Sequence, residues 1–139
     1  MRTIFIDALH LIARVYPHDP WHGPATQAAR LLPQDIRLIT TTSILLEFLA
    51  GMADKGAYYR NRSVEVITAF QSDPSVKLIH PSYDLWQKGL DLYGQRPDKS
   101  YSLVDCISMT VMREEGITEI LSNDHHFEQE GFVCLIKRP

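Results

Sequence analysis

Acidic residues stand at four places where folding could gather them into one site. Asp7 ends an apolar run near the N-terminus, and Asp124 follows a similar run near the C-terminus. Glu47 lies within an apolar helical stretch, where a carboxylate is costly unless something binds it. Asp105 stands early in a further helical stretch. Carboxylates that share a pocket repel one another unless a cation neutralises them.

We predict that this cation is a divalent metal ion held by Asp7, Glu47, Asp105 and Asp124. Oxygen ligands without a paired histidine or cysteine suit a hard ion such as Mg²⁺ or Mn²⁺. Such an ion activates water and stabilises the charge that develops during in-line attack on a phosphodiester. The acid set therefore predicts phosphodiester hydrolysis without a protein nucleophile.

Each acid also has a purely structural interpretation. Asp7 and Asp124 fit the capping of a turn or helix that follows a strand. Ser102 stands three residues before Asp105, as in a capping box. Asp98 fits an ordinary turn. The functional interpretation therefore depends on the whole set of acids and not on any one member.

Strand-like and helical segments alternate along the chain and predict a single α/β domain over residues 1–139. Strands are expected at 3–7, 37–40, 76–79, 119–121 and 132–136. Helices are expected after residue 7 to 15, and at 24–32, 43–53, 58–70, 82–93 and 103–115, with a polar turn between the last two strands. This order predicts a mostly parallel sheet with helices on both faces and a ligand site at the carboxyl ends of its strands.

Composition limits the classes of partner and compartment. The net charge of −3 excludes a protein that grips nucleic acid through overall positive charge, so RNA contacts must come from local patches. The two cysteines lie in no metal-binding spacing, and we expect a reduced, cytoplasmic protein. No apolar run approaches the roughly 20 residues of a membrane-spanning helix, so we expect no membrane partner.

Two local groups of basic residues are candidates for RNA contact. Lys55, Arg60 and Arg62 are interleaved with two tyrosines, and Arg96 and Lys99 flank a short loop. Basic groups hold phosphates while tyrosines stack on unpaired bases. A solvated helix face explains the first group equally well.

The histidines receive structural interpretations. His125 and His126 are adjacent, and we expect them to point apart in a solvated turn instead of binding metal. His10, one helical turn after Asp7, is expected to be a packed or surface residue.

With these motifs, the sequence resembles the PIN domains, and within them the VapC-type toxins of toxin–antitoxin pairs. The matching segments are TIFID at 3–7, TSILLE at 42–47, DKSYSLVDC at 98–106 and LSNDHHF at 121–127. The resemblance implies a three-layer fold and a metal-dependent endoribonuclease. It adds Asp98 as an auxiliary acid and Ser102 and Asn123 as supporting polar groups. It also implies a homodimer and a small antitoxin that inhibits by occupying a hydrophobic groove and placing a basic side chain among the acids.

One departure and two alternatives accompany this interpretation. The family usually has a small hydroxyl residue just after the first aspartate, whereas Ala8 and Leu9 follow Asp7 here. A different metal-dependent phosphohydrolase, such as a phosphatase with an aspartyl nucleophile, would need a carboxylate where Leu9 stands. A non-catalytic RNA- or protein-binding module with the same fold is separated from a nuclease only by a cleavage assay.

Overall fold

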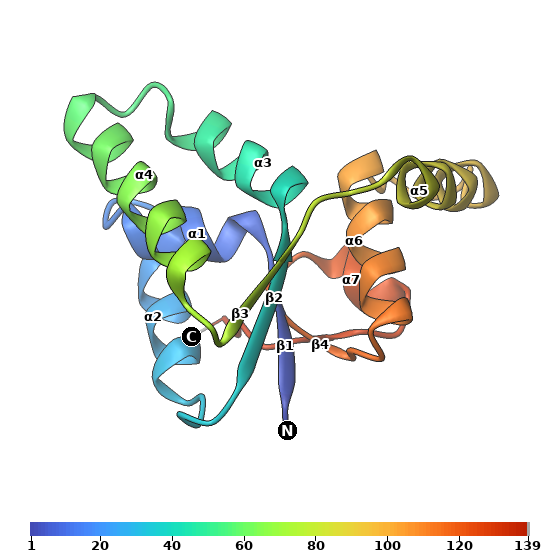
Figure 1. The fold of residues 1–139 in the computed structure, drawn as a ribbon, viewed down its shortest axis with the longest axis horizontal. Coiled ribbons are helices and arrows are strands. Elements are labelled where there is room, and N and C mark those ends of the chain that lie inside the picture. The colour runs from blue at the N-terminus through green and yellow to red at the C-terminus, as the bar shows by residue number, and fades with distance from the viewer. Residues whose placement is uncertain (139) are drawn as a thin grey trace.

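The first strand, β1 (Thr3–Ile6), lies at the centre of a parallel sheet in the computed structural model, which describes residues 1–138 (Figure 1). Across that range the sheet has five strands in the order β3-β2-β1-β4-β5, and every neighbouring pair is parallel. The other strands are β2 (Arg37–Thr41), β3 (Val76–Ile79), β4 (Glu119–Leu121) and β5 (Val133–Cys134). The predicted α/β architecture is confirmed.

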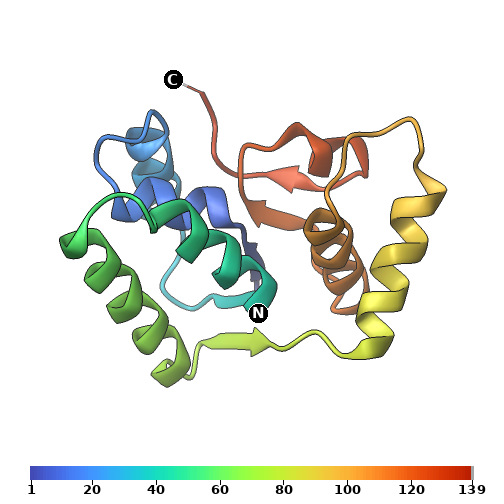
Figure 2. The ribbon, with the colours of Figure 1, turned by 90° about the horizontal axis from the view of Figure 1, so that it is seen from above.

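Helices cover both faces of the sheet, as Figures 1 and 2 show. One face carries α1 (Ala8–Val15), α2 (His22–Arg30), α3 (Thr42–Met52) and α4 (Ala57–Ser72). The other carries α5 (Tyr83–Gln95), α6 (Leu103–Glu114) and α7 (His125–Gln129), with α5 packed against α6. Among residues 1–138 no helix is long and apolar enough to cross a membrane.

Burial in the core explains the run of apolar residues in the central strand β1. Ile4, Phe5 and Ile6 of β1 are at most 1% exposed, because helices cover the sheet on both sides. Phe48 of α3 packs into the core from one face, and Phe127 of α7 packs into it from the other.

Helix α7 was expected to be a polar turn, and that expectation is wrong. The side chain of Asp124 accepts a hydrogen bond from the His126 backbone N–H and caps the helix. Phe127, which is fully buried, attaches this short helix to the core. Two polar histidines at its start conceal this anchor in the sequence.

The apolar residues of α5 are divided between the core and the surface. Leu85, Gly89 and Leu92 are buried against α6. Gly89 permits this close contact, because a Cβ atom at that position would lie 2.6 Å from Ile107 Cγ1. Three further apolar residues of this helix are exposed to solvent, Trp86 to 46%, Leu90 to 42% and Tyr93 to 52%.

The order of the strands creates a switch point beside β1. The chain moves outward from β1 to β2 and β3, then returns to place β4 on the other side of β1. The connecting helices therefore change faces between β1 and β4 (Figure 1). In open parallel sheets, ligands bind at the carboxyl ends of the strands at such a point.

Candidate active site

A pocket of about 340 Å³ opens at the switch point, and all four predicted metal ligands line it. These residues are Asp7, Glu47, Asp105 and Asp124. Asp19 and Trp21, from the loop between α1 and α2, also line this pocket. The structure thus brings together acids from four distant stretches of sequence.

Asp7 follows β1 directly and caps α1. Its Oδ1 atom accepts a hydrogen bond of 2.9 Å from the Ala8 backbone N–H, and its Oδ2 atom accepts one of 2.7 Å from the Ser122 hydroxyl. The Asp124 backbone N–H in turn donates to Ser122 Oγ over 3.0 Å. Ser122 is fully buried and ties the ends of β1 and β4 together.

Asp105 belongs to a capping box at the start of α6, as the sequence suggested. Its Oδ2 atom accepts the Ser102 backbone N–H, its own backbone N–H donates to Ser102 Oγ, and both hydrogen bonds are 3.0 Å long. Its Oδ1 atom takes part in no hydrogen bond between described residues. Capping and pocket lining are therefore compatible roles for this residue.

His126 approaches two of the acids. Its Nδ1 atom lies 3.1 Å from Asp124 Oδ1 and 3.5 Å from Asp105 Oδ2, although neither approach has the geometry of a hydrogen bond. Its ring also packs edge-on against Tyr101, with centroids 5.4 Å apart. The expectation that adjacent histidines point apart is wrong, because the His125 and His126 ring centroids are only 4.6 Å apart.

Glu47 reaches the pocket from α3. Its neighbours Ile44 and Phe48 are buried, whereas Glu47 lies on the exposed side of the helix with its carboxyl group at the pocket. One turn later, Gly51 lets α3 approach α1 closely, since a Cβ atom there would lie 2.6 Å from Ile12 Cδ1. This contact helps to place Glu47 above the end of β1.

The pKa values show that the pocket is electrostatically crowded. Burial raises the pKa of Asp7 to about 7, and the charges of Asp105 and Glu47 add to the rise, against the hydrogen bond from Ser122. Partial burial raises the pKa of Glu47, as do the charges of Asp105 and Asp124. Burial also raises the pKa of Asp105. A bound cation would relieve all three effects.

The donor set fits a hard divalent ion. Carboxylate oxygens predominate in the pocket, and no lysine or arginine among residues 1–138 lines it. Asp124 with the two following histidines also places three potential ligand atoms within 4.8 Å of one another. The residues present therefore suit an oxygen-rich metal site with a histidine at its margin.

The predicted supporting residues lie in different places. Ser102 supports Asp105, whereas Asn123 donates its side-chain N–H to the Ile136 carbonyl and holds the C-terminal segment. Asp98 does not line the pocket, and its side chain is 73% exposed, 3.8 Å from Lys99. Its position gives the predicted auxiliary role no support.

The predicted RNA-binding residues do not form one surface. Arg62 lines a groove that also contains His10, whereas Arg60 lines a different pocket and donates to the Ala53 carbonyl. Lys55 lies over the Tyr16 ring, 4.5 Å from its centroid. The second group lies elsewhere but stays together, because Arg96 and Lys99 line one small pocket, where Arg96 pairs with Glu130 and Lys99 lies near Asp98.

Sequence reasoning did not assign four residues to the site, namely Ser122, His126, Asp19 and Trp21. Ser122 could have been found, because a hydroxyl residue directly after a buried strand is placed to contact the neighbouring strand end. The loop residues Asp19 and Trp21 carry no comparable signal. Asp19 accepts the Trp21 backbone N–H over 2.8 Å, which folds the loop toward the pocket.

The PIN domain family profile matches residues 5–132 of this chain. The chain belongs to the PIN-domain family. The 23S rRNA-specific endonuclease VapC20 of Mycobacterium tuberculosis H37Rv is 25% identical over 130 residues, which cover 94% of this chain and 95% of that protein. The crystal structure of M. tuberculosis VapC20, a sarcin–ricin loop cleaving toxin, matches with a TM-score of 0.82 and 26% identity over 98% of this chain and 99% of that one.

Two more distant structures share the fold. VapBC2 from Rickettsia felis, bound to a DNA fragment from its promoter, matches with a TM-score of 0.66 and 10% identity over 95% of this chain and 96% of the other. A toxin–antitoxin complex from Klebsiella pneumoniae matches with a TM-score of 0.59 and 14% identity over 88% and 87%.

Proposed function

We propose that this protein is an endoribonuclease that hydrolyses RNA phosphodiesters with Mg²⁺ or Mn²⁺ and acts as the toxin of a toxin–antitoxin pair. The observation that carries the proposal is the single pocket lined by Asp7, Glu47, Asp105 and Asp124 at the switch point between β1 and β4. Membership of the PIN family and the similarity to VapC20 support the same conclusion.

The four carboxylates would hold the metal, which supplies water activation and charge stabilisation when it is bound. Ser122 fixes Asp7 relative to Asp124, and Ser102 fixes Asp105 at the start of α6. The N-termini of α1 and α6 also face the pocket, and their dipoles favour negative charge there. The protein therefore presents its acids already oriented.

The partners of the protein are part of the proposal. A groove of about 500 Å³ between α1, α2, α4 and the sheet contains apolar side chains such as Leu32 and Phe70, and it offers a small antitoxin a surface to cover. The exposed residues Trp86, Leu90 and Tyr93 on α5 offer an apolar face to a second copy of the chain. The specificity in the VapC20 name makes 23S rRNA the first substrate to test.

Cleavage of single-stranded RNA and of 23S rRNA by purified protein tests the proposal. We expect activity with Mg²⁺ or Mn²⁺, none in EDTA, and a loss in Asp7→Asn, which keeps a side chain able to cap α1. Cleavage that persists in EDTA after repurification and is equal in Asp7→Asn would show that the acidic pocket is not responsible.

A further inference from the structure

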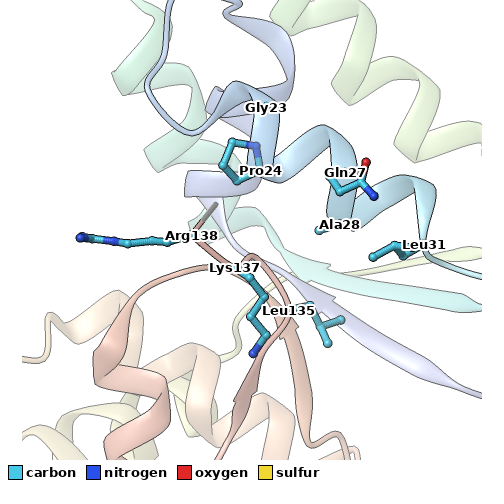
Figure 3. A pocket seen from close by; sticks show the side chains of 8 residues that line it. All are labelled: Gly23, Pro24, Gln27, Ala28, Leu31, Leu135, Lys137 and Arg138. Carbon is cyan, nitrogen blue, oxygen red and sulfur yellow. The ribbon is translucent and has the colours of Figure 1, made fainter.

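Two adjacent cations near the C-terminus, Lys137 and Arg138, have no carboxylate partner among residues 1–138. Both are exposed, and they lie on the segment that runs beside α2 (Figures 2 and 3). Four of the five predicted RNA-binding cations are instead within 4.0 Å of a carboxylate, as Lys99 is of Asp98. Two of the cations that form no ion pair within residues 1–138 therefore lie outside the groups that the sequence motifs indicated.

These two residues border a second pocket, between α2 and the C-terminal segment, with a volume of about 340 Å³. Figure 3 shows Pro24 of α2 and Leu31, just after α2, on one side of it and Leu135 with the stem of Lys137 on the other. Its lining is largely apolar, and its size falls within the range of roughly 300–1,000 Å³ that is typical of small-ligand sites.

Trp21 connects this pocket to the acidic one. The guanidinium of Arg138 lies 5.4 Å from the centroid of the Trp21 ring, in a cation–π contact. Trp21 itself lines the acidic pocket. A strand of RNA that crosses the Trp21–Arg138 pair would therefore occupy both pockets at once.

We infer that the pocket between α2 and the C-terminal segment binds an unpaired nucleobase that flanks the scissile phosphodiester, while Lys137 and Arg138 bind the adjoining phosphates. The inference rests on the proposed function and assigns the path of its substrate. A base presents flat apolar faces beside an anionic backbone, which matches an apolar pocket bordered by cations. Because the protein as a whole is acidic, binding depends on such local charge.

Cleavage kinetics of a single-stranded oligoribonucleotide with Mn²⁺ test the cations. Lys137→Ala/Arg138→Ala is expected to raise KM at least fivefold with kcat within twofold, and to flatten the salt dependence of kcat/KM by about 0.7 per lost phosphate contact. Arg37→Ala is the control. Like the two cations, Arg37 is exposed and forms no ion pair within residues 1–138. It starts β2, however, and therefore lies at the end of the sheet opposite to the acidic pocket. A double variant with wild-type KM and salt dependence would overturn the inference.

The base pocket has its own variant. A Cβ atom at Gly23, which lines the pocket, meets nothing within 4 Å beyond its two chain neighbours, so Gly23→Leu adds bulk to the pocket without contacting other elements of the fold. Gly94 in α5 has the same open surroundings, and Gly94→Leu is the matched control. We expect Gly23→Leu alone to raise KM at least fivefold. Equal KM values for the two variants would overturn the assignment of a base to this pocket.

Fluorescence anisotropy of a labelled oligoribonucleotide in EDTA separates failure of the inference from failure of the proposed function. Wild-type protein that cannot cleave RNA, yet binds it in a manner dependent on Lys137 and Arg138, would refute the nuclease and support the RNA path. Protein that neither cleaves nor binds would overturn both. Competition by a glutamate-rich decapeptide as strong as that by unlabelled RNA would show a general anion or peptide site and overturn the inference.

Discussion

Ser122 donates its hydroxyl group to the Oδ2 atom of Asp7 over 2.7 Å, from a position 115 residues further along the chain. The Oγ atom of Ser122 also accepts a hydrogen bond from the Asp124 backbone N–H. One buried serine therefore holds two pocket acids, which come from opposite ends of the sequence, in a fixed relation.

Ser122→Ala is expected to lower the free energy of unfolding by about 1–3 kcal/mol, because it leaves the Oδ2 atom of the buried Asp7 carboxylate and the Asp124 backbone N–H without a partner. Urea unfolding in EDTA measures this effect. Ser108→Ala is the control, since Ser108 is equally buried but its hydroxyl has no hydrogen-bond partner within residues 1–138. Equal losses in the two variants would show that the Ser122 hydrogen bonds contribute nothing specific.

Asp105→Asn should leave the metal-free melting temperature unchanged or raised, because it relieves repulsion among the acids while an amide oxygen can still accept the Ser102 N–H. Mn²⁺ at 100 times its dissociation constant should stabilise the wild type by about 2.7 kcal/mol and so raise its melting temperature. The variant should gain much less from the metal. Asp35→Asn, an exposed carboxylate before β2, is the control. A variant that melts lower without metal and shows the full metal shift would make Asp105 a cap alone.

His10 predicts a specific pH dependence of stability. Burial, together with the charge of Arg14, lowers the pKa of His10 to about 3, whereas an unfolded histidine titrates near 6.5. The unfolded chain therefore binds the extra proton between these values, and the His10 contribution to stability falls as the pH decreases from 6.5 toward 3. We compare the free energies of unfolding of His10→Gln and wild type, measured in urea at pH 7.5 and at pH 4.5. Relative to wild type, the variant should be more stable at pH 4.5 than at pH 7.5, by on the order of 2 kcal/mol. A difference that does not change with pH would contradict this assignment.

Glu130 should be important for stability although it lies outside the pocket. Burial alone would raise its pKa, but hydrogen bonds from Arg96, Arg113 and Tyr101 outweigh burial and lower the pKa to about 2. Its stabilisation is present above the unfolded pKa of about 4.3 and is lost as the pH falls toward 2. Glu130→Gln should cost about 1–3 kcal/mol at pH 7, measured by urea unfolding.

Glu128→Gln, at an exposed position in α7, provides the comparison for Glu130→Gln. Tyr101 contacts His126, so we also expect Glu130→Gln to reduce kcat while Glu128→Gln does not. Indistinguishable stability in the two variants would contradict the importance of the Glu130 cluster.

Local sequence signals predicted the strands and the four acids because each depends on neighbouring residues. Asp7, Asp105 and Asp124 are indeed helix caps, so the structural interpretation of each acid and its place in the pocket are both correct. The spacing of Arg60 and Arg62 could have excluded their common patch, since two residues apart on a helix point to opposite sides.

The remaining site residues depend on contacts between distant segments. His126 is at the acids because Phe127 anchors α7, and Trp21 is at the pocket because its loop folds back over the end of β1. Neither contact has a signature in the local pattern of residue types. The same is true of Lys137 and Arg138, whose proximity to Trp21 depends on the path of the C-terminal segment along α2.

The position of β1 between β2 and β4 also determines when the acidic pocket exists. Synthesis produces Asp7 first, but Asp105 and Asp124 enter the pocket only when β4 pairs with β1, a contact between residues 4–6 and 119–121. A growing chain on the ribosome therefore lacks the pocket until almost all of the domain has emerged. For a protein proposed to cleave RNA, this means that the complete acid cluster is a property of the finished domain and not of its N-terminal part.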